Sequence, residues 1–473
     1  MKWIRSGKRQ MLLAAPSIKS FDHMRQIIPP NNLMGSLCRE QIYDDQKIYR
    51  DDRYCVSLCI EDGLILYNTL TGEMLLLSHR EYEQRYSSRE NKETLAQKSF
   101  IVQEGFDEKK YADQVRTIAS LMQKRSDRIN SFKLFTTTDC NARCFYCYEM
   151  GRSRVSMSDV IARDAAGYIS RVSKGEKVKL NWFGGEPLYN QWPIEIITSE
   201  LTRIGTEYVS TMISNGYLFD SKTIRKARDE WKLQNVQITL DGTEAVYNRT
   251  KAYVCSSISA YNRVIENIGA LLDAGIKVKV RMNLHKNNAE DLQRLIEELS
   301  DRFAERNGFQ SYIALLKDAQ GSLFHFRDDR DALEIYRALN AMLLRGGIRK
   351  PQELKHSIQL NYCMADDDTC ITILPDGKLG KCEHYSESEF VGSIYEDGLD
   401  QGAVASWKEK IDRIDECNTC AYYPLCNILK KCSYTANTCT ELDRQIRLDE
   451  LKERIHTSYL KATADTALHP IVI

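Results

Sequence analysis

The chain of 473 residues lacks a net charge, because its 66 Lys and Arg residues balance its 66 Asp and Glu residues. This balance offers no electrostatic argument for binding to nucleic acid or to a membrane surface. The chain also lacks an apolar run long enough to span a bilayer. The apolar run near the N-terminus, MLLAAP, is shorter than the core of a secretory signal. We therefore expect a cytoplasmic protein that binds neither nucleic acid nor a membrane.

Cysteine, in contrast, is abundant, with fifteen residues in the chain. In a chain that stays in the cytoplasm, thiolates bound to metal are a better interpretation than disulfides. The four scattered cysteines, for which we expect structural roles, are Cys38, Cys55, Cys59 and Cys255. The other eleven form two groups. The first group is Cys140, Cys144 and Cys147, and the second is Cys363, Cys370, Cys382, Cys417, Cys420, Cys426, Cys432 and Cys439.

Residues 132–317 alternate expected strands with expected helices. The helix predicted over 158–175, for example, follows the strand predicted over 132–138, with Ser158 as its cap and Gly175 as its stop. Such alternation predicts parallel strands joined by right-handed crossovers. Six units are too few for a closed eight-stranded barrel, so we predict an α/β fold with an open or partial barrel. The expected strands are 132–138, 177–183, 209–216, 236–242, 277–285 and 309–317.

The ends of these strands carry polar or glycine-rich residues, and the carboxyl ends are where the chemistry of such sheets lies. The first strand ends in the cysteine group, the second in FGGEP (183–187), the third in Ser214-Asn215-Gly216 and the fourth in Asp241-Gly242. On the fifth strand, alternation of side chains places Arg281, Asn283 and His285 on one face. A buried parallel strand is normally apolar on both faces. These residues therefore predict a polar cavity.

Three cysteines are one fewer than the four thiolates that usually hold a four-iron cluster. One iron is then left without a protein ligand and can bind a small molecule, as an open zinc site binds water. The spacing Cys140-x3-Cys144-x2-Cys147, with Tyr146 before the last cysteine, resembles the signature of radical S-adenosylmethionine (radical SAM) enzymes. The resemblance extends over the whole alternating region 132–317. It implies a partial (βα)6 radical SAM barrel.

This resemblance also implies a cofactor and roles for residues. In the family, the open iron chelates S-adenosylmethionine (SAM), and an electron from the cluster releases a 5′-deoxyadenosyl radical that removes a hydrogen atom from the substrate. Gly184-Gly185-Glu186-Pro187 resembles the family's GGEP motif, in which the glycines permit close backbone approach and the carboxylate accepts hydrogen bonds from the methionine ammonium. A flavodoxin- or ferredoxin-type protein is the implied electron donor.

The other positions that match cofactor contacts of the family are Tyr146, Ser214, Asn215, Gln237, Asp241, Arg281 and Asn283. We expect Tyr146 to pack on the adenine, and Arg281 would suit a carboxylate. Asp241 is the one weak candidate for a general base, and a contact with the cofactor is its alternative role.

The second cysteine group resembles the SPASM extension of radical enzymes that modify peptides and proteins, such as RiPP maturases. Its eight cysteines suffice for two auxiliary clusters, which makes three [4Fe–4S] clusters in all. The resemblance assigns one cluster to Cys363, Cys370, Cys382 and Cys432, and the other to Cys417, Cys420, Cys426 and Cys439. Five residues separate Cys426 from Cys432 where the family usually has three, so the assignment of cysteines to clusters stays open. Structural zinc sites are the alternative.

Before the barrel, residues 54–86 predict two or three strands with turns at Asp62-Gly63 and Thr71-Gly72, followed by a helix. Strands followed by helices resemble the winged-helix modules that bind the leader of a precursor peptide as an added edge strand. A packing cap on the barrel is the alternative. The tail predicts an amphipathic helix docked on the body.

These patterns together predict five parts of the chain. They are an N-terminal extension (1–40), a winged-helix-like peptide-recognition module (41–125), the radical SAM partial barrel (126–320), a bridging helix with the SPASM domain (321–445), and a C-terminal helix and tail (446–473).

Our hypothesis is an enzyme that modifies a ribosomally synthesised precursor peptide, forming a thioether, a carbon–carbon crosslink or an epimer. One alternative is an anaerobic sulfatase-maturating enzyme, which oxidises a Cys or Ser side chain to formylglycine and needs no module to read a leader. The other is a non-catalytic zinc-binding scaffold, which the iron and sulfide content of the protein distinguishes.

Overall fold

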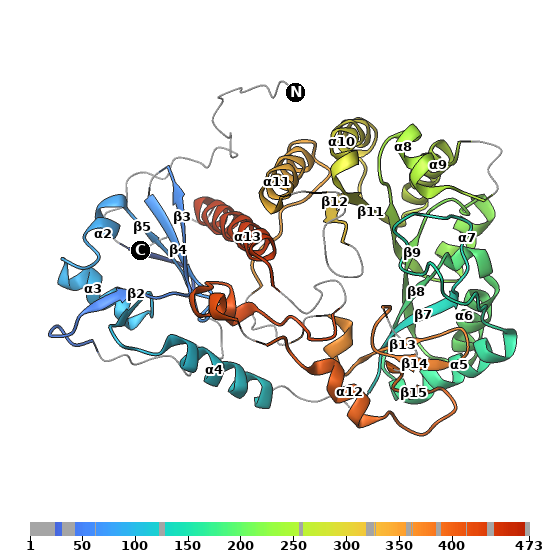
Figure 1. Ribbon diagram of the computed structural model, residues 1–473, viewed down its shortest axis with the longest axis horizontal. Coiled ribbons are helices and arrows are strands. Elements are labelled where there is room, and N and C mark those ends of the chain that lie inside the picture. Colours follow the sequence, from blue (N-terminus) through green and yellow to red (C-terminus); the bar gives the residue numbers. More distant parts are fainter. Residues whose placement is uncertain are drawn as a thin grey trace.

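The computed structural model places the N-terminal residues on one side, the barrel on the other and the cysteine-rich C-terminal part between them (Figure 1). The scattered Cys38 and Cys255, together with Asp62 of the first expected turn, lie outside the described residues. None of the described helices is both long and apolar enough to cross a membrane. The structure describes residues 24–30, 43–61, 63–122, 128–254, 259–317, 326, 328–355, 361, 363–384, 389–412, 414–432 and 439–468.

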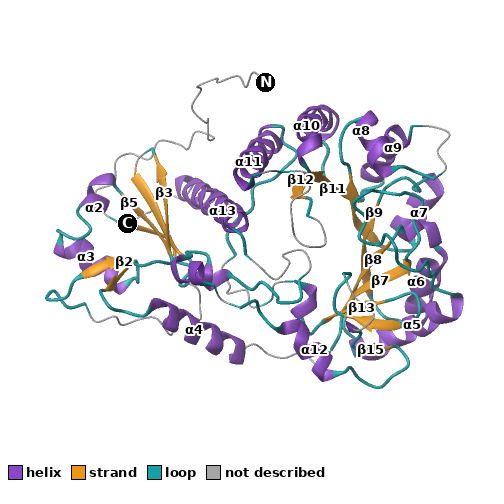
Figure 2. Ribbon diagram, viewed as in Figure 1, coloured by secondary structure: helices purple, strands orange, loops and turns teal. Residues whose placement is uncertain are grey.

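The predicted α/β barrel is confirmed. Its six parallel strands are hydrogen-bonded in chain order: β7 (Ser131–Thr137), β8 (Val178–Gly184), β9 (Tyr208–Ser214), β10 (Leu233–Thr239), β11 (Lys277–Leu284) and β12 (Phe309–Leu315). Helices follow the strands and cover one face of the sheet (Figure 2). They are α5 (Asp159–Ser173), α6 (Trp192–Ile204), α7 (Ser221–Asp229), α8 (Glu244–Lys251), α9 (Ala260–Asp273) and α10 (Ala289–Phe303).

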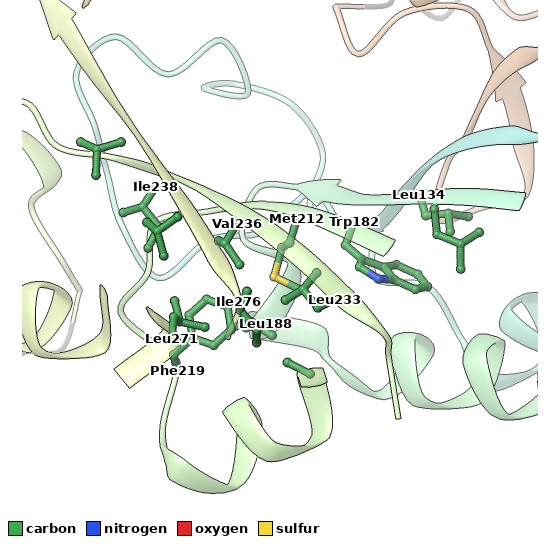
Figure 3. Close-up of a cluster of buried hydrophobic side chains, with 14 of the residues drawn as sticks. Leu134, Trp182, Leu188, Met212, Phe219, Leu233, Val236, Ile238, Leu271 and Ile276 are labelled. Carbon is green, nitrogen blue, oxygen red and sulfur yellow. The ribbon is translucent and has the colours of Figure 1, made fainter. Parts of the chain in front are cut away.

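Local sequence explains where these elements begin and end. Helix α5 begins after Ser158, whose side chain accepts a hydrogen bond from the Ile161 N–H, and the chain leaves it through Gly175 at φ +83°. Both termini were predicted. Between helices and sheet, Trp182, Met212 and Val236 of three neighbouring strands belong to one buried apolar cluster (Figure 3). Burial of such side chains supplies most of the stability of the fold.

The barrel sheet is wider than the sequence predicted. Strand β13 (Cys370–Ile373) pairs in parallel with the outer edge of β7, with Cys370 opposite Ser131. Strands β14 (Lys378–Gly380) and β15 (Gly392–Ser393) continue the sheet in antiparallel fashion, which gives nine strands. The cysteine-rich part is therefore joined to the strand that leads into the first cysteine group.

The N-terminal module contains an antiparallel sheet in the order β1 (Arg25–Ile28), β5 (Met74–Leu77), β4 (Gly63–Asn68) and β3 (Cys55–Ile60). The chain reverses between β3 and β4 and again between β4 and β5, as predicted. Strand β1 falls in a stretch too irregular for sequence patterns to assign. The remaining elements are β2 (Tyr49–Asp51), α2 (His79–Glu83), α3 (Arg89–Gln97), β6 (Ile101–Gln103) and α4 (Glu108–Met122).

Two C-terminal segments hold this module. Helix α13 (Glu441–Leu468), the predicted C-terminal helix, packs Leu451, Ile455 and Tyr459 into one apolar cluster with residues of β4 and β5. On another side, Tyr423 stacks on Tyr54 with ring centroids 6.1 Å apart. The remaining helices of the C-terminal part are the bridging α11 (Asp329–Arg345) and α12 (Gln401–Lys408).

Candidate active site

The first cysteine group lies in a loop at the carboxyl end of β7, as predicted for the chemistry of a parallel sheet. The loop is fixed to the region that follows α8, because the Arg143 N–H donates to the Lys251 carbonyl at 2.8 Å and the Val254 N–H donates to the Asn141 carbonyl at 3.0 Å. Burial raises the pKa of the Cys140 thiol to about 12, and the charges of Cys144 and Cys147 add to this shift. The Cys140 thiolate therefore needs a bound cation, which iron would supply.

The GGEP motif packs against the backbone that leads into this loop. A Cβ atom on Gly184 would lie 2.1 Å from the Thr137 carbonyl oxygen, and one on Gly185 would lie 2.3 Å from that of Asp139. The N–H groups of Gly185 and Glu186 donate to these same two carbonyls, each at 3.0 Å. The glycines thus permit close approach, as expected, and the partner seen in the structure is the end of β7.

The Glu186 carboxylate is fully buried and joins the ends of β8 and β9. It accepts hydrogen bonds from the Asn215 N–H at 2.7 Å, the Ser214 hydroxyl at 2.9 Å and the Leu188 N–H at 3.1 Å. Burial raises the pKa of Glu186 to about 7, although these three donors stabilise its charged form. A carboxylate has about four acceptor positions. One therefore remains for a further donor.

Asn215 links this carboxylate to the cysteine loop. Its side-chain amide donates to the Asn141 Oδ1 at 2.7 Å and approaches the Cys140 Sγ at 3.8 Å. The structure thus brings together Glu186, Ser214 and Asn215 with the first cysteine of the loop, as the motif positions predicted.

Asp241 and Tyr146 also meet, and they do so around a residue that sequence reasoning missed. The Tyr146 hydroxyl donates to the Asp241 Oδ2 at 2.7 Å, and the Lys251 Nζ lies 3.0 Å from both groups. The side chains of Lys251 and Asp241 are only 4% and 1% exposed. A lysine in the last turn of a helix is normally solvated, so its sequence position gave no signal. Lys251 and Tyr146 thus both bind the Asp241 Oδ2, and the general-base role of Asp241 stays a prediction.

A cavity of about 1020 Å³ opens between the barrel and the C-terminal part. Its barrel wall includes Gln237, which accepts a hydrogen bond from the Tyr312 hydroxyl at 3.0 Å, and Arg281, which donates to the Asn283 side chain at 2.8 Å. Tyr146 lines the same wall. Arg281 and Asn283 of the fifth strand therefore do border a cavity, together with Gln237 of the fourth. His285, predicted on the same face, does not line it and instead accepts a hydrogen bond from the Asn287 N–H at 3.3 Å.

The opposite wall of the cavity carries Cys363, Cys382 and Cys432. Burial is the larger cause that raises the pKa of both Cys363 and Cys382, and the charge of Cys432 adds to the first shift as the charge of Cys363 adds to the second. Cys370 lies at the start of β13, and its Sγ is 3.8 Å from the Thr369 hydroxyl. Cys432 thus lines the same cavity as Cys363 and Cys382, two of the three cysteines with which the resemblance grouped it, and the assignment to a cluster stays a prediction.

Of the other four cysteines, Cys417 and Cys420 lie against the N-terminal module. Cys426 acts electrostatically on both Cys420 and Cys439. Cys417 and Cys420 pack beside Tyr54 and Tyr423. Within the described part of the chain, no three His, Cys, Asp or Glu side chains are grouped tightly enough to hold a single metal ion. A four-iron cluster, which is a larger body, spreads its ligands more widely.

Comparison with known proteins agrees with this geometry. The family model described as the radical SAM superfamily matches residues 134–299, from the strand before the cysteine loop to helix α10. These residues form a radical SAM domain. The activity of such a domain requires SAM and a [4Fe–4S] cluster.

Among curated proteins, the GTP 3′,8-cyclases of Campylobacter curvus and Clostridium perfringens (strain SM101) are 24% and 25% identical to this chain. Each match covers 56% of this chain, and they cover 77% and 84% of those enzymes.

Two solved structures superpose on a larger part of the chain than the radical SAM domain alone. Native anSMEcpe with bound AdoMet superposes with a TM-score of 0.55 at 14% identity, covering 71% of this chain and 100% of that one. Streptococcus suis SuiB bound to precursor peptide SuiA superposes with a TM-score of 0.50 at 11% identity, covering 80% and 95%. At such identities the likeness shows the fold alone.

The residues of the radical SAM domain fit the cofactor that it implies. Within the described residues, the buried polar atoms at the cysteine loop that have no hydrogen-bond partner include the acceptor Asp241 Oδ1 and the donor Asn141 Nδ2. SAM carries hydroxyl, ammonium and carboxylate groups that can pair with both. A buried polar atom is costly unless it is paired. The cysteine loop would hold the cluster, and these atoms with Glu186 would hold SAM.

Proposed function

We propose that the protein is a radical SAM enzyme that modifies a ribosomally synthesised precursor peptide, forming a thioether, a carbon–carbon crosslink or an epimer. The observation that carries this proposal is the cavity of about 1020 Å³ shared by the radical SAM domain and the C-terminal cysteines. Small-molecule pockets typically measure about 300–1000 Å³. This cavity therefore accommodates SAM together with a segment of a larger substrate.

The two sides of the cavity have complementary roles in this proposal. On the barrel side, Cys140, Cys144 and Cys147 hold the cluster that binds SAM, and Gln237, Arg281 and Asn283 border the cofactor. On the other side, Cys363, Cys382 and Cys432 bring the first auxiliary cluster to the cavity wall. Two auxiliary clusters would pass electrons or support the fold, and a flavodoxin- or ferredoxin-type protein would supply the reducing electron.

We further propose that strand β3 captures the leader of the precursor. Among the described strands, none pairs with its outer edge. The Thr69 N–H donates to the Tyr54 carbonyl at 2.9 Å, so these two residues form a hydrogen-bonded pair. Hydrogen-bonded and non-hydrogen-bonded pairs alternate along an antiparallel ladder, so every second residue of β3 after Tyr54 bonds to β4. The exposed residues Ser57 and Cys59 then direct their backbone groups outward. An edge of this kind accepts an extended peptide as an added strand.

Neighbouring structures support a peptide substrate, since SuiB is bound to the precursor peptide SuiA and anSMEcpe to the Cp18Cys peptide. The fold shared with anSMEcpe keeps sulfatase maturation as the second candidate. The N-terminal module favours the precursor peptide, because a sulfatase-maturating enzyme needs no leader-binding edge. The curated relatives make GTP a third substrate to exclude.

The test uses the full chain, reconstituted with iron and sulfide without oxygen, then reduced and mixed with SAM. Each short peptide encoded beside its gene is added in turn and examined by mass spectrometry. A crosslink is expected to remove the mass of two hydrogen atoms, whereas an epimer takes up deuterium from heavy water. A sulfatase peptide and GTP are tested in parallel. Formylglycine or a cyclised nucleotide as the product would refute the proposal.

The leader-binding edge needs a separate test by point substitution. Deletion of residues 1–125 is unsuitable, because it would expose the apolar side chains of α13 and the stacking face of Tyr423. Ser57→Pro removes an outward-facing N–H and leaves the ladder with β4 in place. It should weaken precursor binding in calorimetry and preserve SAM cleavage without peptide. Ser57→Ala, which keeps the N–H, is the matched control and should bind like the wild type. Equal binding by both variants would exclude this edge.

A further inference from the structure

Lys251 contacts the cysteine loop through both its backbone and its side chain. Its carbonyl accepts a hydrogen bond from the Arg143 N–H at 2.8 Å. Its Nζ lies 3.0 Å from the hydroxyl of Tyr146, which stands between Cys144 and Cys147. Lys251 is thus attached to the loop on either side of Cys144.

The ammonium of Lys251 is a buried charge with one acidic partner. Asp241 lies 3.0 Å away, and the rings of Tyr146 and Tyr247 flank the ammonium at 5.6 and 5.8 Å. Burial lowers the pKa of Lys251, but the charges of Asp241 and Cys144 outweigh burial and raise it well above its ordinary value. The ion pair thus places two buried and opposite charges beside the loop. The motif positions give Asp241 a contact with the cofactor, but they give Lys251 no role.

Charges at this depth act strongly on a cluster, because water does not screen them as it screens surface charges. Reduction adds one negative charge to an iron–sulfur cluster. A nearby positive charge stabilises the reduced form and raises the reduction potential, whereas a nearby negative charge lowers it. Net charge, hydrogen bonding and exposure are the main ways in which a protein sets the potential of such clusters.

We propose that the Lys251–Asp241 pair sets the reduction potential of the cluster held by Cys140, Cys144 and Cys147. Lys251 is a positioning residue, which holds the loop and places a fixed positive charge beside it. Asp241 balances this charge and, through Tyr146, keeps the ammonium in place. This inference rests on the radical SAM domain alone and is independent of the substrate.

The test compares two variants that break the same ion pair and leave opposite charges behind. Lys251→Met removes the positive charge, leaves the carboxylate and should shift the potential to more negative values. Asp241→Asn leaves the ammonium and should shift it to more positive values. The measurement is redox titration of the full chain followed by electron paramagnetic resonance. The signal that changes on addition of SAM identifies the relevant cluster.

Tyr146→Phe is the matched control, since it removes a hydrogen bond from the pair without changing any charge. Its potential should lie between those of the two charge variants. Shifts of both charge variants in the same direction would indicate mere structural damage and overturn the proposal, as would the absence of a shift in both. If Lys251→Met does not retain iron, the measurement on Asp241→Asn tests the proposal alone. An unchanged or lowered reduction potential in that variant would then refute the role of the ion pair. Lys251→Arg, which keeps the charge, should retain a potential close to that of the wild type.

Discussion

Glu186→Gln tests the proposed link between the GGEP motif and the cofactor. The structure defines what the substitution changes. Oε1 of Glu186 accepts from the Leu188 N–H and the Ser214 hydroxyl, whereas Oε2 accepts only from the Asn215 N–H among the residues that the structure describes. The amide oxygen of glutamine is therefore expected to stay between the two donors. The new NH2 group then faces the Asn215 N–H and cannot accept a hydrogen bond from an ammonium.

The expected loss follows from the charge of the missing contact. A hydrogen bond to a charged group contributes about 1.5–3 kcal/mol. Its loss should weaken SAM binding by roughly tenfold to a hundredfold. The cluster itself should assemble normally, because cysteines alone ligate it. Glu186→Gln should therefore keep its iron and its visible absorption, and need much more SAM to produce 5′-deoxyadenosine.

The pH dependence of SAM binding separates this role from a general disturbance. Burial raises the pKa of Glu186 to about 7, and only the ionised carboxylate attracts an ammonium. Wild-type affinity for SAM should thus fall by about tenfold for each pH unit below that value. The glutamine variant cannot titrate, so its affinity should be weak and constant over the same range.

The same substitution has a consequence for stability with a defined sign. The raised pKa means that between pH 4.5 and about 7 the folded chain binds more protons at Glu186 than the unfolded chain does. The ionised carboxylate therefore costs about 3 kcal/mol of folding free energy above neutral pH, and the cost disappears as the pH falls through this window. The stability of Glu186→Gln relative to the wild type should accordingly rise as the pH increases from 4.5 to about 7.

Ser214→Ala is the matched control for the binding measurements. It removes one neutral hydrogen bond, which contributes about 0.5–1.5 kcal/mol, and keeps the carboxylate. Because the Ser214 hydroxyl stabilises the charged form, its loss should raise the pKa of Glu186 and move the fall in affinity to higher pH. Anaerobic calorimetry across the pH range measures all three proteins. A glutamine variant that keeps the wild-type affinity and pH profile would show that GGEP only shapes the turn, and loss of iron would show that Glu186 supports the cluster or the fold.

Three further outcomes are expected. Three four-iron clusters predict about twelve irons per chain, and joint replacement of Cys140, Cys144 and Cys147 by Ala should remove about four, so an unchanged iron content would contradict the assignment. The activity should be lost on exposure to air, and full activity after prolonged aerobic handling would count against a radical mechanism. Ile455→Ala should lower the free energy of unfolding by about 2–5 kcal/mol, because this fully buried side chain packs against the N-terminal sheet. A thermal transition equal to that of the wild type would show that α13 does not hold the module.

Local patterns predicted the barrel and much of the site for identifiable reasons. The strands and helices of residues 132–317 repeat with their own periods, and the polar residues come at the ends of those strands. The grouping of Glu186 with Ser214 and Asn215 follows, because the carboxyl ends of neighbouring parallel strands meet at one edge of the sheet.

The features that sequence reasoning missed are contacts between distant segments. Strand β13 pairs with β7 although Cys370 and Ser131 are far apart in the chain, and no local pattern encodes such a partner. Lys251 makes its contacts with Asp241 and Tyr146 only because the ends of β10 and α8 meet the cysteine loop in the folded chain. Tyr423 likewise lies in a cysteine-rich stretch, and its stacking on Tyr54 depends on how two parts of the chain dock.

The pairing of β13 with β7 also bears on the order in which the protein matures. During synthesis, the outer edge of β7 remains unpaired until the ribosome has added the residues up to Ile373. An unpaired edge strand invites association with other nascent chains. The loop with the first three cysteines leaves this same strand, so its surroundings are complete only after the C-terminal part has folded onto the barrel. Before that point, the cysteine loop lacks part of the structure that surrounds it in the folded chain. We therefore expect insertion of the first cluster after translation has ended.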